Sequence, residues 1–318
     1  MKEFKGYKKG IDLGGWLSQC DYSKERLEGF IKEEDIKTIT DWGADHVRLP
    51  IDFNILEDNN GGYLESGFGY ISGAVELCGK YGLNIVIDLH KTAGFSFDKG
   101  EKETGFFDSE ALQERFYKLW EEISKRFGND PAHIAFELLN EVTDKEFSPK
   151  WNKIVHECIA RIRKFAPDTP ILVGSYWNNS VSAVKDLDDP YDDKVVYNFH
   201  CYDPIEFTHQ HAYWVEADRF DVSKDMSFEE SGACEEYFEE LFAEAVRKAE
   251  ENDTVLYCGE YGVIDKASPE DTLKWYKAIN AVFEKHNIGR CAWCYKEMDF
   301  GLSDKRLDGI REELLKYI

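Results

Sequence analysis

Short apolar segments rich in β-branched residues alternate along this chain with longer segments of helical period. The strand-like segments are residues 9–13, 46–49, 84–89, 134–139, 171–173, 195–199, 254–257 and 290–293. The segments of helical period are residues 24–42, 67–81, 109–127, 149–165, 228–251, 269–286 and 306–317, with a poorer candidate at 179–187. Strands interleaved with helices are typical of βαβ units and a parallel sheet. Eight such units predict an α/β fold, a closed (β/α)8 barrel of the TIM type.

No break in composition marks a linker, so we expect residues 1–318 to form a single domain. Two connections are longer than this fold requires: residues 91–108 after the third strand and about 201–227 after the sixth. Long loops in compact domains either carry function or are disordered. Because both connections are rich in aromatic residues, we expect folded loops, the second forming an enlarged insert.

The chain carries 39 Lys and Arg residues against 63 Asp and Glu residues, a formal net charge of -24. A surface this acidic repels nucleic-acid phosphates and anionic lipids. We find no basic patch, so we expect neither nucleic acid nor a membrane as a partner. Residues 216–251 hold 13 acidic and 4 basic residues, which is typical of a solvated insert and helix face.

The first ten residues contain four lysines and lack the apolar run of a signal peptide. The sequence as written therefore predicts a cytoplasmic protein, or a secreted one whose leader has been removed. No stretch reaches the roughly 18 apolar residues of a membrane-spanning helix. The eight cysteines are sparse, and we expect reduced, mostly buried thiols. Only Cys291 and Cys294 have metal-ligand spacing, and a structural zinc site needs four ligands.

Polar and aromatic residues follow the predicted strands at the end where active sites of such barrels lie. These residues are Arg48, His90, Asn140, Glu141, His200, Tyr202, Glu260 and Trp293. Two glutamates flanked by hydrogen-bond donors can perform acid, base and nucleophilic steps themselves. The set therefore does not require a metal.

Glu141 and Glu260 follow the fourth and seventh strands, on opposite sides of the barrel mouth. If their carboxyl groups are about 5 to 5.5 Å apart, one can attack an anomeric carbon while the other protonates the leaving oxygen, with retention of configuration. Donors such as Arg48 and Tyr202 would keep the nucleophile ionised, whereas burial raises the pKa of an acid. Asn140 can bond a sugar 2-hydroxyl. Trp293 offers a flat apolar face for a pyranose ring.

Seven segments make the sequence similar to a known family. They are GIDLGGW (10–16), HVRLP (46–50), IVIDLH (85–90), AFELLNE (135–141), NFHCY (198–202), GEYG (259–262) and CAWCY (291–295). With them the chain resembles the glycoside hydrolase family 5 enzymes of clan A, the cellulase family, over nearly its whole length. The resemblance implies a (β/α)8 barrel and a retaining β-glycosidase without cofactors, in which Glu141 is the acid/base and Glu260 the nucleophile.

The segment FTHQHAYW (207–214) resembles the insert of a subgroup of bacterial endo-β-1,4-glucanases. Asp12 is a departure, because asparagine is common at that place in the first-strand motif. Further candidates for substrate contact are Trp16, Trp177, Trp214 and His209. Large aromatic residues usually serve packing, so packing and sugar contact both stay open for the three tryptophans. For His209, the resemblance of the insert favours a contact.

We expect an endo-acting, retaining β-1,4-glucanase that works as a monomer on a neutral β-linked polysaccharide or oligosaccharide, cellulose-like or of mixed linkage. A β-mannanase or glucomannanase and a β-1,3-glucanase of the same family remain alternatives. A metal-dependent barrel enzyme could use His90, Glu141, His200 and Glu260, but it leaves Asn140 and Trp293 without a role. A non-catalytic sugar-binding protein would not need both carboxylates.

Overall fold

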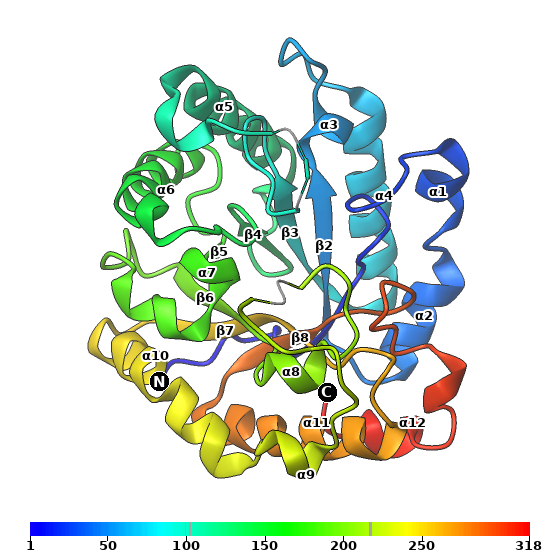
Figure 1. The fold of residues 1–318 in the computed structure, drawn as a ribbon. Coiled ribbons are helices and arrows are strands. Elements are labelled where there is room, and N and C mark those ends of the chain that lie inside the picture. The colour runs from blue at the N-terminus through cyan, green and yellow to red at the C-terminus, as the bar shows by residue number, and fades with distance from the viewer. Residues whose placement is uncertain (99, 102, 216–217) are drawn as a thin grey trace.

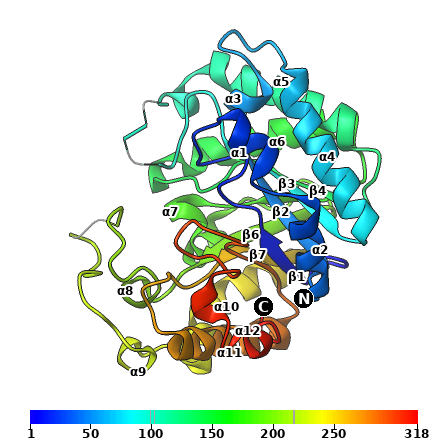
Figure 2. The same ribbon diagram turned by 90° about the vertical axis from the view of Figure 1, so that its right-hand side faces the viewer.

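Eight parallel strands close into a barrel in the order in which they follow one another along the chain (Figures 1 and 2). The computed structural model describes residues 1–98, 100–101, 103–215 and 218–318. The strands are β1 (Lys9–Asp12), β2 (His46–Asp52), β3 (Asn84–Lys91), β4 (Ile134–Glu137), β5 (Ile171–Val173), β6 (Val195–Cys201), β7 (Val255–Tyr261) and β8 (Gly289–Ala292). Ile11 lies opposite both Val47 and Ala292, so β1 pairs with β2 and β8 and closes the ring. The predicted (β/α)8 barrel is confirmed.

Helices surround the barrel (Figure 1). The α-helices are α1 (Lys24–Gly29), α2 (Glu33–Asp41), α3 (Phe53–Leu56), α4 (Glu65–Tyr81), α5 (Glu110–Phe127), α6 (Ser148–Ile162), α8 (Ile205–Thr208), α9 (Phe228–Ser231), α10 (Glu235–Glu251), α11 (Pro269–His286) and α12 (Arg311–Leu314). The segment labelled α7 (Tyr176–Asn179) is a short turn in which Trp177 and Asn178 have left-handed backbones. Short 3-10 turns are η1 (Phe106–Asp108), η2 (Lys145–Phe147), η3 (Val181–Asp186) and η4 (Lys305–Leu307).

Two long predicted helices are each divided in the structure. The segment 24–42 breaks between α1 and α2, because Phe30 and Ile31 turn into the core and Lys32 is extended, with φ -123° and ψ 169°. The Asp35 carboxylate then accepts the Lys32 N–H at 2.8 Å and starts α2. The segment 228–251 breaks at Gly232, whose left-handed backbone (φ 72°) ends α9.

Two shorter predictions also differ from the structure. The segment 306–317 contains only η4 and α12 as helical turns. The segment 179–187 is the 3-10 turn η3 rather than an α-helix. Propensity alone does not show such local breaks, because tertiary packing decides them.

Side chains inside the barrel change from apolar to polar along the strands. An apolar cluster fills the lower interior: Phe4, Tyr7, Val86, Ala135, Leu172, Val196, Tyr257 and Cys291. Two residues further along β3, β4 and β6 stand Asp88, Glu137 and Asn198, all fully buried. Because side chains alternate with period two, these point into the same interior. The strands thus deliver a polar layer to the C-terminal end of the barrel.

Both long connections are packed against the barrel. Phe95, Phe106 and Phe107 are buried in the connection after β3, and Phe207 is buried in the one after β6. Figure 2 shows the segment with α8 and α9 extending to the left of the strands. Residues 99, 102, 216 and 217 of these connections, including Glu216 of the acidic segment, lie outside the described residues. The expectation of folded loops is confirmed for the part that is described.

The cysteines are all free thiols, six of them buried, as expected. Across the described ranges, no helix combines the length and apolarity needed to cross a membrane.

Candidate active site

The residues expected at the strand ends come together at the C-terminal end of the barrel. Arg48 lies in β2, His90 in β3, His200 in β6 and Glu260 in β7. The others follow a strand directly or closely: Asn140 and Glu141 after β4, Tyr202 after β6 and Trp293 after β8. Hydrogen bonds or ring contacts link every one of these side chains to another of them or to a shared neighbour.

Glu141 and Glu260 face each other closely. One carboxylate oxygen of each, together with a ring nitrogen of His200, lies within 4.8 Å of the other two atoms. Paired carboxylates about 5 Å apart suit a retaining displacement at a sugar, whereas inverting enzymes need roughly 6.5 to 9.5 Å to admit a water. The pair therefore has the spacing for nucleophilic attack by one member and proton transfer by the other.

Glu260 is held by donors that favour its ionised form. Arg48 Nη1 donates to Glu260 Oε1 at 2.7 Å, and the Tyr202 hydroxyl donates to Oε2 at 2.9 Å. His200 Nδ1 is a further 3.5 Å from Oε2. Charge-assisted bonds of this kind fix both the charge and the direction of a carboxylate.

Glu141 has a different environment. Its Oε1 is 2.9 Å from His200 Nδ1, and its Oε2 accepts from Asn178 Nδ2 at 3.1 Å. Both partners are neutral at pH 7. Asn178 carries an amide, and burial lowers the pKa of His200 to about 4. Glu141 has a left-handed backbone, with φ 43°. A left-handed non-glycine residue is uncommon and is found disproportionately at functional sites.

Burial raises the pKa of both carboxyl groups to about 7. Burial is the main reason for the raised pKa of Glu260. His200 and the positive charge of Arg48 lower this pKa, and the charge of Glu141 raises it further. At neutral pH the pair then holds about one proton. Because Glu260 bonds directly to the guanidinium, we place the negative charge on Glu260 and the proton on Glu141.

Arg48 lies at the centre of a buried polar network. Its Nε and Nη2 donate to the two carboxylate oxygens of Glu137 at 2.7 and 2.9 Å, and Nη1 also reaches Asp12 Oδ1 at 3.1 Å. Asp88 Oδ2 lies 3.0 Å from Nη2. Together with Glu260, four carboxyl groups surround one guanidinium that is fully buried.

Three of those carboxyl residues, Asp12, Asp88 and Glu137, were not among the predicted site residues. Burial raises the pKa of each, to about 7 for Asp88, and the charge of Arg48 opposes the rise. Their sequence signal was an acidic residue inside an apolar strand, as in IVIDLH and AFELLNE. An acid at an inward position of a buried strand needs a partner, and Arg48 is that partner.

Asn178 and Asn179 were also missed, and the sequence offers no periodic signal for them. They lie in α7, between β5 and η3. Asn178 contacts Glu141, and Asn179 Nδ2 lies 3.5 Å from His200 Nε2.

His90 and Trp293 form one side of the site. Their rings are parallel within 1°, with centroids 6.0 Å apart, and His90 Nδ1 is 2.5 Å from Asp88 Oδ2. Burial holds the pKa of His90 well below its ordinary value, so His90 is neutral at pH 7. Gly14 makes room for the indole, because a Cβ there would lie 2.7 Å from the Trp293 ring.

The structure separates the other aromatic candidates. Trp16 is 6% exposed and its Nε1 donates to the Leu27 carbonyl, so this ring packs in the core. Trp177 is 47% exposed and is followed by Asn178, which contacts Glu141. His209 is half-buried against the Tyr202 ring, with centroids 5.0 Å apart, and its ring centroid lies 6.3 Å from that of Trp214. His209 therefore packs against the Tyr202 ring. Trp177 and Trp214 remain candidates for sugar contact.

The group Glu141, His200 and Glu260 also has the donor types of a metal site. However, Arg48 places a positive charge 2.7 Å from Glu260, and Tyr202 donates to the other oxygen. A metal ion at Glu260 would meet charge repulsion and would have to break these bonds. The contacts fit an acid and base pair better than a metal centre.

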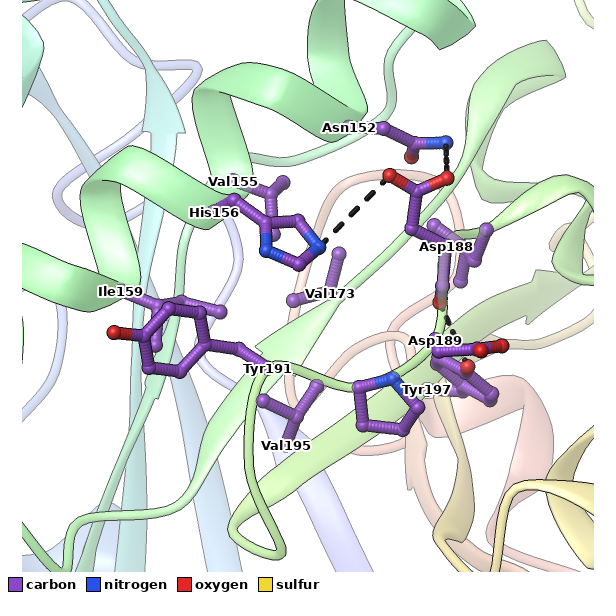
Figure 3. Close-up of a pocket in the computed structure, with 12 residues that line it drawn as sticks. Asn152, Val155, His156, Ile159, Val173, Asp188, Asp189, Tyr191, Val195 and Tyr197 are labelled. Carbon is purple, nitrogen blue, oxygen red and sulfur yellow. Dashed lines mark hydrogen bonds and ion pairs between the residues drawn. The ribbon is translucent and has the colours of Figure 1, made fainter.

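A separate hollow lies on the flank of the barrel between α6 and the strands β5 and β6 (Figure 3). Val155, Ile159 and Val173 form its floor, while His156 and Asp188 face each other at 3.8 Å across it. Its free volume of about 20 Å³ holds little more than a water molecule. None of the predicted site residues lines it, so it is not the substrate site.

The sequence is similar to those of known glycoside hydrolases. The family model described as cellulase (glycosyl hydrolase family 5) matches residues 8–299. Cellodextrinase A of Ruminococcus flavefaciens is 60% identical over 292 residues, which cover 91% of this chain and 86% of the relative. Endoglucanase C of Acetivibrio thermocellus is 37% identical over 337 residues, and the match covers 98% of each chain.

Solved structures give the same result. Cellulose synthase subunit Z of Clostridioides difficile superposes with a TM-score of 0.83 at 25% identity, over 98% of this chain and 99% of that one. Cel5A of Thermotoga maritima, solved in complex with mannotriose, superposes with a TM-score of 0.82 at 26% identity, over 98% and 97%. The chain therefore belongs to the cellulase family, glycosyl hydrolase family 5, and is a cellulase-type glycoside hydrolase.

Proposed function

We propose that this enzyme cleaves β-1,4-glucosidic bonds by a retaining double displacement, with Glu260 as nucleophile and Glu141 as acid/base. The observation that carries the proposal is the carboxylate pair within 4.8 Å, one member bonded to a guanidinium and the other to neutral groups. This asymmetry supports the two proposed roles, because a nucleophile must be ionised when an acid is protonated.

In the first step, a Glu260 oxygen forms a bond to the anomeric carbon while the glycosidic bond breaks. Glu141 gives its proton to the departing oxygen, and an ester links the sugar to Glu260. In the second step, Glu141 takes a proton from water, and the water oxygen displaces Glu260 from the anomeric carbon. Two inversions leave the product with the configuration of the substrate.

Neighbouring residues support both steps. Asn140 Oδ1 accepts from Arg48 Nη2 at 2.8 Å, which fixes the amide. Asn140 Nδ2 is buried and has no hydrogen-bond partner among the described residues, so this donor is free for a sugar hydroxyl. The Tyr202 hydroxyl donates to Glu260 Oε2 and so fixes the orientation of this carboxylate. The Trp293 ring offers an apolar surface for the pyranose.

The substrate in this proposal is a neutral β-1,4-linked glucose chain, including soluble cello-oligosaccharides. The relative named cellodextrinase, at 60% identity, supports short chains, and the relative named endoglucanase supports internal cleavage. A net charge of -24 does not oppose binding of an uncharged polymer. β-Mannan is the second candidate, because a relative of 26% identity was solved with mannotriose.

The stereochemical test follows hydrolysis of cellotetraose by proton NMR. The β-anomer should appear first and the α-anomer only by mutarotation. Glu260→Gln and Glu141→Gln should each lose at least about 100-fold in kcat on cellotetraose. Glu240→Gln, at an exposed position of α10, is the control and should keep parental activity. Initial release of the α-anomer, or parental turnover by both site variants, would refute the mechanism.

The substrate test compares initial rates on cello-oligosaccharides, carboxymethylcellulose, mixed-linkage glucan, glucomannan and laminarin, each with and without EDTA. We expect the highest rates on β-1,4-glucose chains and no effect of EDTA. Dominant activity on mannan or laminarin would replace the substrate assignment and leave the mechanism standing.

A further inference from the structure

Three consecutive residues between β5 and η3 have left-handed backbones. Trp177 has φ 53° and ψ 50°, Asn178 has φ 56° and ψ 51°, and Asn179 has φ 55°. We call residues 177–179 the left-handed turn. Residues with a Cβ rarely adopt this conformation, and asparagine adopts it more readily than most. Such a run persists only where the surrounding structure enforces it.

The segment that follows Glu141 enforces the turn. Trp177 N–H donates to the Thr143 carbonyl and Asn178 N–H donates to the Val142 carbonyl, both at 3.0 Å. Gly174 also makes room, because a Cβ there would lie 2.2 Å from the Asn179 side chain. The left-handed turn is therefore fixed directly to the backbone that carries Glu141.

The turn places one side chain on the carboxyl group. Asn178 Nδ2 donates to Glu141 Oε2 at 3.1 Å, while the other oxygen faces His200 at 2.9 Å. Because Oε1 lies 2.9 Å from His200 Nδ1, we assign the transferable proton to Oε2. Because the Asn178 amide already donates to Oε2, we expect the O–H bond of the protonated Oε2 to point away from Asn178 and toward the bound substrate.

We propose that Asn178 is a positioning residue for Glu141, held by the left-handed turn so that its amide orients the proton-bearing oxygen toward the leaving group. The inference rests on the proposed role of Glu141 as acid/base and extends it to a residue outside the strand ends. Asn178 itself takes no part in bond making or breaking.

The amide also affects how readily Glu141 ionises. Its hydrogen bond lowers the pKa of Glu141 against the dominant effect of burial. The other titratable and charged groups that face Glu141 are Arg48, Asp88, Asp98, Glu137, His200, Tyr202 and Glu260. Asn178→Gly leaves the identity of every one of these residues unchanged. Removing the amide should therefore raise the pKa of Glu141 and move the alkaline limb of kcat/KM to higher pH.

Asn178→Gly tests the proposal, because glycine keeps the left-handed backbone without strain and deletes the amide. We compare kcat/KM for cellotetraose, whose leaving group needs a proton, with kcat/KM for 2,4-dinitrophenyl β-cellobioside, whose leaving group does not. The variant should lose about 10-fold or more on cellotetraose and less than about threefold on the dinitrophenyl substrate. Its alkaline limb on cellotetraose should shift upward.

Asn287→Gly is the matched control, since Asn287 is also left-handed (φ 55°) but lies exposed at the end of α11. It should match the parent on both substrates. Equal losses of the Asn178→Gly variant on both substrates, or an unshifted pH profile, would overturn the proposal. Glu141→Gln distinguishes failure of the acid/base assignment from failure of the role proposed for Asn178. If Glu141→Gln hydrolyses cellotetraose at the parental rate, the acid/base assignment itself is wrong.

Discussion

Arg48 is the residue on which the buried charges of the site depend. It is fully buried and is the only cation among the contacts of Asp12, Asp88, Glu137 and Glu260 that the structure describes. A buried ion pair contributes little net stability, but removing one partner is costly because the other charge stays buried.

Arg48→Met should therefore lower the free energy of unfolding by about 3–5 kcal/mol at pH 7.5. The loss should be smaller at pH 5, because the raised pKa values of the four carboxyl groups let them take up protons. Urea unfolding at the two pH values measures this. Arg247→Met, at an exposed ion pair, is the control and should stay within about 0.5 kcal/mol of the parent. An equal loss at both pH values would contradict the argument.

The shared proton of Glu141 and Glu260 predicts the pH dependence of the rate. Activity needs Glu260 ionised and Glu141 protonated, and burial raises the pKa of both groups to about 7. Because the two sites interact, the profile reports two macroscopic values that belong to the pair. The profile of kcat/KM on cellotetraose should be bell-shaped, with its maximum on the acidic side of neutrality and its alkaline limb falling near pH 7 to 8. Full activity maintained at pH 9.5 would show that Glu141 is not the acid.

At the scale of elements, two of the four glycines of helix α4 have opposite structural roles. Gly67 is buried against the Ile55 carbonyl, and a Cβ at Gly67 would lie 2.0 Å from that oxygen. Gly69, two residues later, is exposed, and a Cβ there would meet nothing within 4 Å. Substitution by alanine should therefore stabilise the protein at one of these positions and destabilise it at the other.

Gly69→Ala should stabilise the protein by about 0.5–1 kcal/mol, because alanine loses less backbone entropy in a helix. Gly67→Ala should destabilise it by about 1–3 kcal/mol, because α4 must move away from α3. Urea unfolding of the two variants under identical conditions measures both. Stabilisation by both substitutions would mean that the contact between α3 and α4 is loose.

The elements differ in how far the sequence could predict them. All eight strands were found in order, since a buried parallel strand is a compact apolar run bounded by turns. The helix break at Phe30 was not found, because two residues leaving the helix to fill the core is a tertiary effect. The eight strand-end residues were found because the fold places strand ends together. Asn178 was not, because its position depends on three left-handed residues that no pattern of apolar residues encodes.

At the scale of the whole molecule, the barrel separates two kinds of acid. Exposed carboxylates such as Asp221 and Glu313 bond to neighbouring lysines and have pKa values lowered to about 2. Buried ones at the strand ends have pKa values raised toward 7. The formal net charge of -24 counts both kinds, whereas the proposed chemistry depends on the second.

These two kinds affect stability in different pH ranges. A carboxyl whose pKa is lowered on folding stabilises the fold above about pH 4 and loses this effect only below it. A carboxyl whose pKa is raised stabilises the fold only below its unfolded pKa of about 4, and its ionisation opposes folding as pH rises toward 7. His200 and His209, whose pKa values burial lowers to about 4, act in the opposite sense between about pH 4 and 6.5, and His90, whose pKa burial also lowers, acts in that sense below about pH 6.5. The pH dependence of the parent's stability is therefore a sum of opposing contributions and does not report on any single group.

The difference between the parent and Glu141→Gln isolates one largely buried acid, whose side chain is 13% exposed. Glutamine resembles the protonated carboxyl at every pH, so the variant avoids the cost of keeping Glu141 protonated in the fold. It should be slightly more stable than the parent at pH 5. The advantage should grow to roughly 1–3 kcal/mol by pH 7 and then level off, since the folded pKa of Glu141 is about 7. Urea unfolding from pH 5 to 9 measures the difference, and 1 M NaCl should change it little because the site is buried. Glu240→Gln on the exposed face of α10 should show no such trend, and a constant difference in Glu141→Gln would mean that Glu141 is ionised throughout.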